Sequence, residues 1–173
     1  MNPQMSHYAR ILRVARSGAP DRAWEMLADS GLLKKRGEAR AFTLKGRLLK
    51  DRARRAPADQ RAMLFGEAAT AYLRAHQVDR ASYPLINAAT LTLLAKDAVR
   101  SRELAQQTLD LLDSNPAEAE TAYWLGATRA EAHLLLGDGD TAQAAMRDAV
   151  VQAPKAWEDH AATIGQFELL AEV

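Results

Sequence analysis

The chain has 173 residues, of which 26% are charged and 48% hydrophobic, and its formal net charge is +1. These values describe a globular domain of ordinary size and exclude a disordered chain, so we expect one domain over residues 1–173. The absence of cysteine excludes disulfides and thiolate metal sites.

Composition favours helix throughout. The chain contains 36 Ala and 23 Leu, whereas Val and Ile together number 9. Ala and Leu lead the helix-propensity ranking, and β-branched residues favour strands. No segment alternates between apolar and polar residues with the period of two that a half-buried strand needs. We therefore expect an all-α protein with more than two-thirds of its residues in helices.

The first half divides into four expected helices, at about 4–17, 21–30, 38–55 and 58–76. Gly18 and Pro20 separate the first two, and Gly31 ends the second. Ala56 and Pro57 open the fourth. The link between the third and fourth helices is about ten residues longer than a helical repeat of about 34 residues needs.

The second half divides into five expected helices. They lie at about 84–95, at 99–112, from Pro116 to Gly137, from Asp140 to about Ala153, and at 156–171. Short links make neighbouring helices antiparallel. The chain should therefore form about four antiparallel helix pairs and a closing helix.

Residues 123–156 carry the spacing of a tetratricopeptide repeat, a helix pair of about 34 residues. Ala130 takes the small position of the first helix, and Ala142 and Ala149 take those of the second. Gly137 occupies the turn, and Pro154 ends the unit. Small residues let two helix axes approach closely. The pattern predicts a tetratricopeptide-like α-solenoid.

A second internal alignment joins three of the expected helices. Asn87–Thr90, Thr128–Glu131 and Thr163–Gln166 align on a small residue, at separations of 41 and 35 residues. Each segment places polar side chains three positions apart, on one face of its helix.

These segments also resemble a known family. The resemblance rests on residues 83–91 (YPLINAATL), 123–128 (YWLGAT), 130–132, 137–138 and 162–167 (ATIGQF). They look like a bacterial tetratricopeptide family related to the TRAF-binding region of the apoptosis-signal-regulating MAP kinase kinase kinases. The match covers about 83–170, and the N-terminal half resembles generic repeats. The resemblance implies an α-solenoid that binds proteins as a signalling scaffold.

In such a solenoid the first helix of each pair lines the concave face, where partners usually bind. The expected partner-binding residues are Tyr83, Asn87, Thr90, Trp124, Thr128, Glu131, Thr163 and Gln166. The alternative role for the polar members is hydrogen bonding between helices that fixes the stack. For Tyr83 and Trp124 the alternative is packing.

No pattern in the chain indicates catalysis. The sequence contains no HExxH, EF-hand or P-loop motif, and Gly137–Asp140 is interpreted as a turn and helix cap. His160 follows Glu158 and Asp159, but these residues do not make a metal site. We expect no enzyme activity, no cofactor and no metal.

Nothing in the sequence indicates export or a membrane span. The N-terminus, Met1 to Met5, has no apolar segment of a signal peptide, and the longest apolar runs are a few residues. We expect a cytoplasmic protein.

Charge is distributed unevenly along the chain. Residues 34–61 hold eleven Lys and Arg against three Asp and Glu (+8), and residues 110–172 hold twelve acidic against three basic residues (−9). Solvated surface is one interpretation of both. A second function is therefore open, in which the 34–61 hairpin binds nucleic acid or an acidic partner. The expected basic patch comprises Lys45, Arg47, Lys50, Arg52, Arg54 and Arg55, the last three extending beyond the stack. We expect a monomer or weak self-association.

Overall fold

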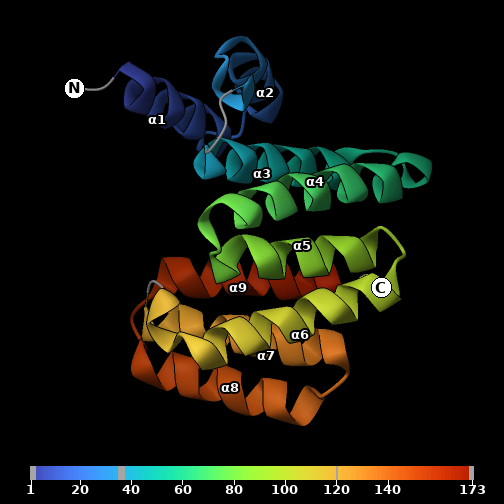
Figure 1. Ribbon diagram of the computed structural model, residues 1–173, viewed down its shortest axis with the longest axis vertical. Coiled ribbons are helices and arrows are strands. Elements are labelled where there is room, and N and C mark those ends of the chain that lie inside the picture. Colours follow the sequence, from blue (N-terminus) through green and yellow to red (C-terminus); the bar gives the residue numbers. More distant parts are fainter. Residues whose placement is uncertain (1–2, 35–37, 120, 172–173) are drawn as a thin grey trace. The chain divides into compact units, whose positions relative to one another are not determined.

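A computed structural model of the chain describes residues 3–34, 38–119 and 121–171 (Figure 1). These residues form nine α-helices and two short 3-10 helices, with no strand in the described part of the chain. The all-α expectation is confirmed. The chain divides into two compact units, Met1–Arg80 and Ala81–Val173, and each is described by itself. The expectation of one domain over 1–173 stays a prediction.

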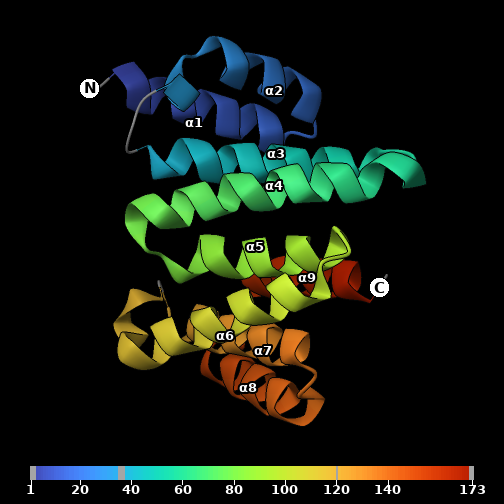
Figure 2. The same cartoon turned by 45° about the vertical axis from the view of Figure 1, so that its right-hand side comes forward.

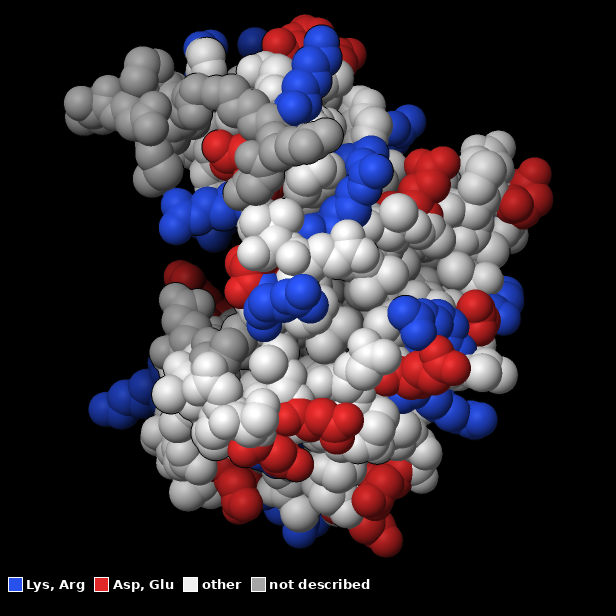
Figure 3. Space-filling model, in the orientation of Figure 1, with Lys and Arg blue, Asp and Glu red and all other residues white. Residues whose placement is uncertain are grey.

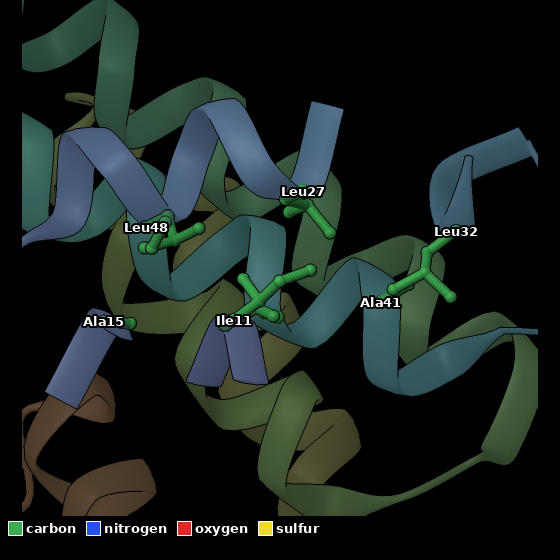
Figure 4. Packing of buried hydrophobic residues seen from close by; sticks show 8 residues of the cluster. Ile11, Ala15, Leu27, Leu32, Ala41 and Leu48 are labelled. Carbon is green, nitrogen blue, oxygen red and sulfur yellow. The ribbon is translucent and has the colours of Figure 1, made fainter. Parts of the chain in front are cut away.

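The first unit contains α1 (Pro3–Arg16), α2 (Pro20–Asp29), the 3-10 turn η1 (Leu32–Lys34), α3 (Ala39–Arg55) and α4 (Ala58–Asp79). Its core joins α1, α2, η1 and α3 through the buried residues Ile11, Ala15, Ala23, Leu27, Leu32, Ala41, Leu44 and Leu48 (Figure 4). Fully burying a Leu or Ile side chain contributes roughly 1.5–3 kcal/mol, so this cluster holds the three α-helices together.

The α3–α4 hairpin corrects an expectation about the link between these helices. Only Ala56 and Pro57 lie between α3 and α4, so the additional residues lengthen the helices and the connection stays short. Within the first unit, the linked end of the hairpin extends past α1 and α2 in both ribbon views (Figures 1 and 2). Gly46 allows the two helices to approach closely, because a Cβ there would lie 2.5 Å from a ring carbon of Tyr72.

The second unit contains α5 (Ser82–Leu94), α6 (Ala98–Ser114), the 3-10 turn η2 (Pro116–Glu118), α7 (Ala122–Leu136), α8 (Gly139–Gln152) and α9 (Trp157–Leu170). One expected boundary here is wrong. The helix expected to start at Pro116 starts at Ala122, because the Thr121 side chain caps it by accepting a hydrogen bond from the Trp124 N–H at 3.2 Å.

The turns α5–α6 and α7–α8 repeat one design, 41 residues apart. The residue before the capping Asp has positive φ in each turn, 72° at Lys96 and 88° at Gly137. The next residue, Asp97 or Asp138, donates its N–H back to the preceding helix and then caps the following helix, accepting at 3.0 and 3.1 Å. The sequence therefore encodes two successive copies of the same helix pair.

Packing within the α7–α8 pair follows the tetratricopeptide alignment. Ala130, Ala142 and Ala149 are buried, as the repeat spacing predicts. Gly126 is a further small position that the spacing did not single out, since a Cβ there would lie 2.7 Å from the Cβ of Ala149. Tyr123, Ala127 and Ala149 form a buried cluster against which Trp124 and Met146 pack.

Candidate functional site

The polar row aligned from the sequence forms a hydrogen-bonded network across three helices. Glu131 on α7 is 8% exposed, and its Oε1 accepts a hydrogen bond from Thr90 Oγ1 of α5 at 2.5 Å. The same oxygen accepts from Gln166 Nε2 of α9 at 2.7 Å. A buried carboxylate is costly unless donors satisfy it. Thr90 and Gln166 therefore tie α5 and α9 to α7 through one side-chain oxygen of Glu131.

A second link joins α7 and α9 through an aromatic cluster. The Tyr123 hydroxyl donates to Thr163 Oγ1 at 2.9 Å, and both side chains are buried. The centroid of the Tyr123 ring lies 5.3 Å from that of the Trp124 ring, in an edge-to-face arrangement. It lies 5.1 Å from the centroid of the His160 imidazole. His160 also lies 5.8 Å from Trp157 and is 3.0 Å from the Ala153 carbonyl oxygen through Nε2. His160 thus packs among aromatic rings at the start of α9.

Asn87 and Thr128 complete the row but lie below the surface. Both are buried, and Asn87 Nδ2 donates to the Tyr83 carbonyl oxygen one turn earlier, at 3.0 Å. Tyr83 is 50% exposed at the start of α5. Trp124 packs into the α7–α8 cluster. The structure thus brings together Thr90, Glu131 and Gln166 in one network and Thr163 with Tyr123 in another. Partner binding by the eight residues stays a prediction.

The position of α9 explains why the row is covered. In both ribbon views α9 lies beside α5 and α7, and the two side-chain links described above connect it to α7 (Figures 1 and 2). Gly126 faces α8, and Glu131 lies five residues further, about 140° around the helix axis. The α7 face that carries Glu131 is therefore different from the face that packs on α8, and α9 covers it.

Tyr123 is the functional candidate that sequence reasoning missed. It sits in the sequence beside Trp124, which was selected, and its hydroxyl supplies the bond to Thr163. The available signal was an aromatic pair in the first turn of α7. One of two adjacent helical aromatics must face a different direction from the other, and only the fold shows which one points to α9.

The basic residues of α3 have mixed environments. Lys45, Arg47 and Lys50 are half-buried, whereas Arg54 and Arg55 are exposed. The Arg52 guanidinium lies over the Trp24 ring of α2, 5.2 Å from its centroid, so Arg52 packs within the first unit instead of extending beyond it. On the face drawn in Figure 3, basic side chains gather over α2 and α3, and acidic ones are more numerous over α8 and the adjoining part of α6.

Neither a metal-binding cluster nor a membrane-spanning helix occurs in the described part of the chain. Residues 3–34, 38–119 and 121–171 contain no group of three or more His, Asp or Glu side chains that could hold a metal ion. No helix within the same ranges combines the length and apolar character that crossing a membrane requires.

Comparisons with known proteins agree with this architecture. The family described as "TPR-S: Tetratricopeptide Repeats-Sensor" has a model that matches residues 2–92. That match overlaps the segment expected from sequence, about 83–170, only at its beginning, and it covers the half that had resembled generic repeats. No curated protein matches the chain.

A solved structure resembles most of the chain. It is the crystal structure of a thermophilic tetratricopeptide protein of Thermus thermophilus, with a TM-score of 0.69. The two sequences are 18% identical, and the match covers 96% of this chain and 83% of that one. At this identity the likeness shows the fold, which is a tetratricopeptide-like α-solenoid.

Proposed function

This chain belongs to the Tetratricopeptide Repeats-Sensor family, and from that premise we propose that it works as a protein-binding scaffold in a signalling system. Its partner is a protein or peptide, and it binds at the face that α5 and α7 form and that α9 now covers. The proposal includes no catalytic step and no cofactor. We place the protein in the cytoplasm, in keeping with the absence of cysteine from its sequence.

The observation that carries this proposal is the repeated helix pair. Helical repeats stack so that the first helix of each pair contributes to one extended face, which proteins of this architecture use for binding. Here α5 and α7 are the first helices of two pairs that share one turn design, and their polar side chains meet at Glu131. Tyr83, half-exposed at the start of α5, supplies an aromatic side chain of the kind enriched in binding hot spots.

The signalling part of the proposal has two supports. The name of the matching family includes the word sensor. The segments 83–91, 123–128 and 162–167 resemble relatives of the TRAF-binding region of MAP kinase kinase kinases. Both point to a module that receives or relays a signal by binding.

Affinity capture from the native host, with cross-linking and mass spectrometry, tests the proposal. We expect the wild-type chain to cross-link to one set of proteins through α5, α7 or α9. Tyr83→Ala should weaken that capture about tenfold, which is the size of a modest hot spot. Val99→Ala, an exposed apolar position on α6, is the matched control and should capture normally. Equal capture by both variants would show that the partner does not bind at the face assigned to it.

The alternative function is electrostatic binding of nucleic acid or an acidic partner through the basic 34–61 hairpin, which includes α3 and the start of α4. Its specific support is the exposure of Arg54 and Arg55 near the linked end of the hairpin. Retention on heparin or RNA columns discriminates between the two functions. If this hairpin binds phosphate, retention should fall steeply with salt and Arg54→Glu/Arg55→Glu should abolish it. Elution of the wild type at low salt rejects the alternative.

A further inference from the structure

The face of α5 and α7 that would receive a partner already holds a helix, α9. Gln166 donates to Glu131, and Thr163 accepts from Tyr123, so α9 satisfies two polar groups that are buried on this face. Leu169, three residues after Gln166, is buried as well. Thr163, Gln166 and Leu169 follow one another at intervals of three and therefore lie along one side of α9.

Apart from these contacts and the ring contact of His160 with Tyr123, α9 buries few apolar side chains. Among its described residues only Thr163 and Leu169 are buried. Trp157 is 71% exposed and Ile164 is 58% exposed, and they lie seven residues apart on one face of the helix. By contrast, most of α5 is buried. Segments with few buried apolar contacts open at a lower free energy than the rest of a fold.

Glu131 sets the chemistry that any occupant of this face must have. Thr90 of α5 donates one hydrogen bond to the carboxylate, and a further donor, the amide of Gln166, comes from α9. An occupant without a donor at that point would leave the buried carboxylate with one donor fewer, which costs more than an ordinary hydrogen bond contributes. The Tyr123 hydroxyl likewise needs an acceptor where Thr163 now stands.

We propose that α9 is an exchangeable internal ligand of this face, and that the partner docks as an α-helix in its place. The partner helix carries a hydroxyl residue, an amide residue three positions later and a Leu-like residue after three more, the pattern of Thr163, Gln166 and Leu169. The inference rests on the proposed function and specifies how its partner is recognised. The partner must displace α9, so the fraction of chains with α9 open scales the apparent affinity.

A labelled peptide with the sequence of residues 156–171 serves as the probe, and its fluorescence anisotropy with the full-length chain is the measurement. The wild type should bind it weakly, because its own α9 competes. The Thr163→Ala/Gln166→Ala chain should bind it about tenfold more tightly or better, since two hydrogen bonds that hold the internal helix are gone. A peptide carrying the Gln166→Ala change and a scrambled peptide should both bind poorly.

Matched variants decide whether the peptide occupies the α9 position. Adding Glu131→Ala to the double variant should remove the gain in peptide affinity, whereas adding Trp157→Ala, on the exposed face, should preserve it. Equal affinity of the wild type and the double variant would overturn the inference. So would a stable dimer of the wild type formed by exchange of α9 between two copies, because the occupant would then be a second copy.

Hydrogen exchange of the wild type keeps the inference testable if the double variant does not fold. The α9 amides should exchange at least about tenfold faster than those of α7, through local opening. Equal protection of the two helices would overturn the proposal. The peptide result is independent of the host's proteins. If the peptide does not bind, only the inference about α9 is contradicted. If the capture experiment yields no partner, the proposed function is contradicted.

Discussion

At the scale of single residues, the two glycines of α7 and α9 occupy opposite environments. A Cβ at Gly126 would lie 2.7 Å from the Cβ of Ala149 and 3.2 Å from a backbone oxygen of α8, whereas a Cβ at Gly165 would meet nothing within 4 Å. Gly126 is therefore a packing requirement of the α7–α8 pair. Gly165 makes no such contact.

We expect Gly126→Ala to lower the free energy of unfolding by about 1–3 kcal/mol, because overpacking pushes α7 and α8 apart. The matched substitution Gly165→Ala should raise it by about 0.5–1 kcal/mol, because Ala replaces Gly in a helix without a clash. Urea denaturation of both variants measures the difference. Changes of the same sign would contradict the close approach of α7 and α8.

Asp138 gives a residue-scale prediction about pH. Its side chain caps α8, and the hydrogen bonds with Thr141 hold the pKa of the carboxyl below its ordinary value. A lowered folded-state pKa means that the stabilisation is present above the unfolded-state pKa and is lost as pH falls through the folded-state value. The cap should therefore weaken only below about pH 4.

Asp138→Asn tests this titration, because an Asn side chain also caps helices but does not titrate. The wild type should be more stable than this variant at pH 6, and the difference should shrink as pH falls to 3. Thermal unfolding across this range provides the measurement. A difference that stays constant with pH would show that the carboxylate charge contributes nothing at α8.

At the scale of elements, glycine, proline and capping residues in the sequence predict most helix ends. The prediction fails where the position of a helix end depends on residues that are distant in the sequence. Gly18, Gly31 and Gly137 all take positive φ at helix ends, a conformation that glycine adopts without penalty. The local sequence therefore determines these helix ends. The start of α7 was missed because Pro116 begins a 3-10 turn while Thr121 caps the helix, and both residues are reasonable starts in isolation.

The candidate site follows the same division between local and distant information. Spacing aligned Thr90, Glu131 and Gln166, and the structure joins them. Spacing could not show that α9 covers the face instead of extending it. The local sequence of α9 is the same whether the helix covers this face or extends it. The position of α9 depends on contacts between residues far apart in the sequence, such as the hydrogen bond from Tyr123 on α7 to Thr163 on α9.

The α3–α4 hairpin leads to a prediction about Arg52. The Arg52 guanidinium stacks over Trp24, and its removal takes away both this contact and the packing of its aliphatic stem. Arg52→Ala should lower the free energy of unfolding by about 0.5–2 kcal/mol. Arg54→Ala, exposed in the same last turn, controls for the helix dipole and should change stability little. Equal losses would assign the effect to the dipole alone.

At the scale of the whole molecule, charge separates the two halves of the sequence. Residues 34–61 carry a balance of +8 and residues 110–172 a balance of −9, although the chain as a whole is nearly neutral at +1. Two copies can bring a basic stretch and an acidic stretch together. Exposed charges of this kind speed encounter more than they tighten binding, and single exposed pairs contribute little.

We therefore expect weak self-association that depends on salt. Charges are screened beyond about 20 Å at 20 mM salt and beyond about 5 Å at 500 mM, so any attraction between copies should disappear over this range. Sedimentation velocity at high protein concentration should show a rising apparent mass at 20 mM salt and a monomer at 500 mM. A monomer under both conditions would leave the uneven charge as solvated surface.

Charge reversal locates the contact. Arg54→Glu/Arg55→Glu lowers the net charge of the protein by four units, at the exposed end of the hairpin. This variant should stay monomeric at 20 mM salt. Arg100→Glu/Arg102→Glu makes the same change at exposed positions of α6, outside the basic stretch, and should leave self-association intact. If both variants abolished it equally, net charge alone would govern association. Loss in the hairpin variant only would place the basic stretch in the contact, because the two proteins share one net charge and differ only in where it lies.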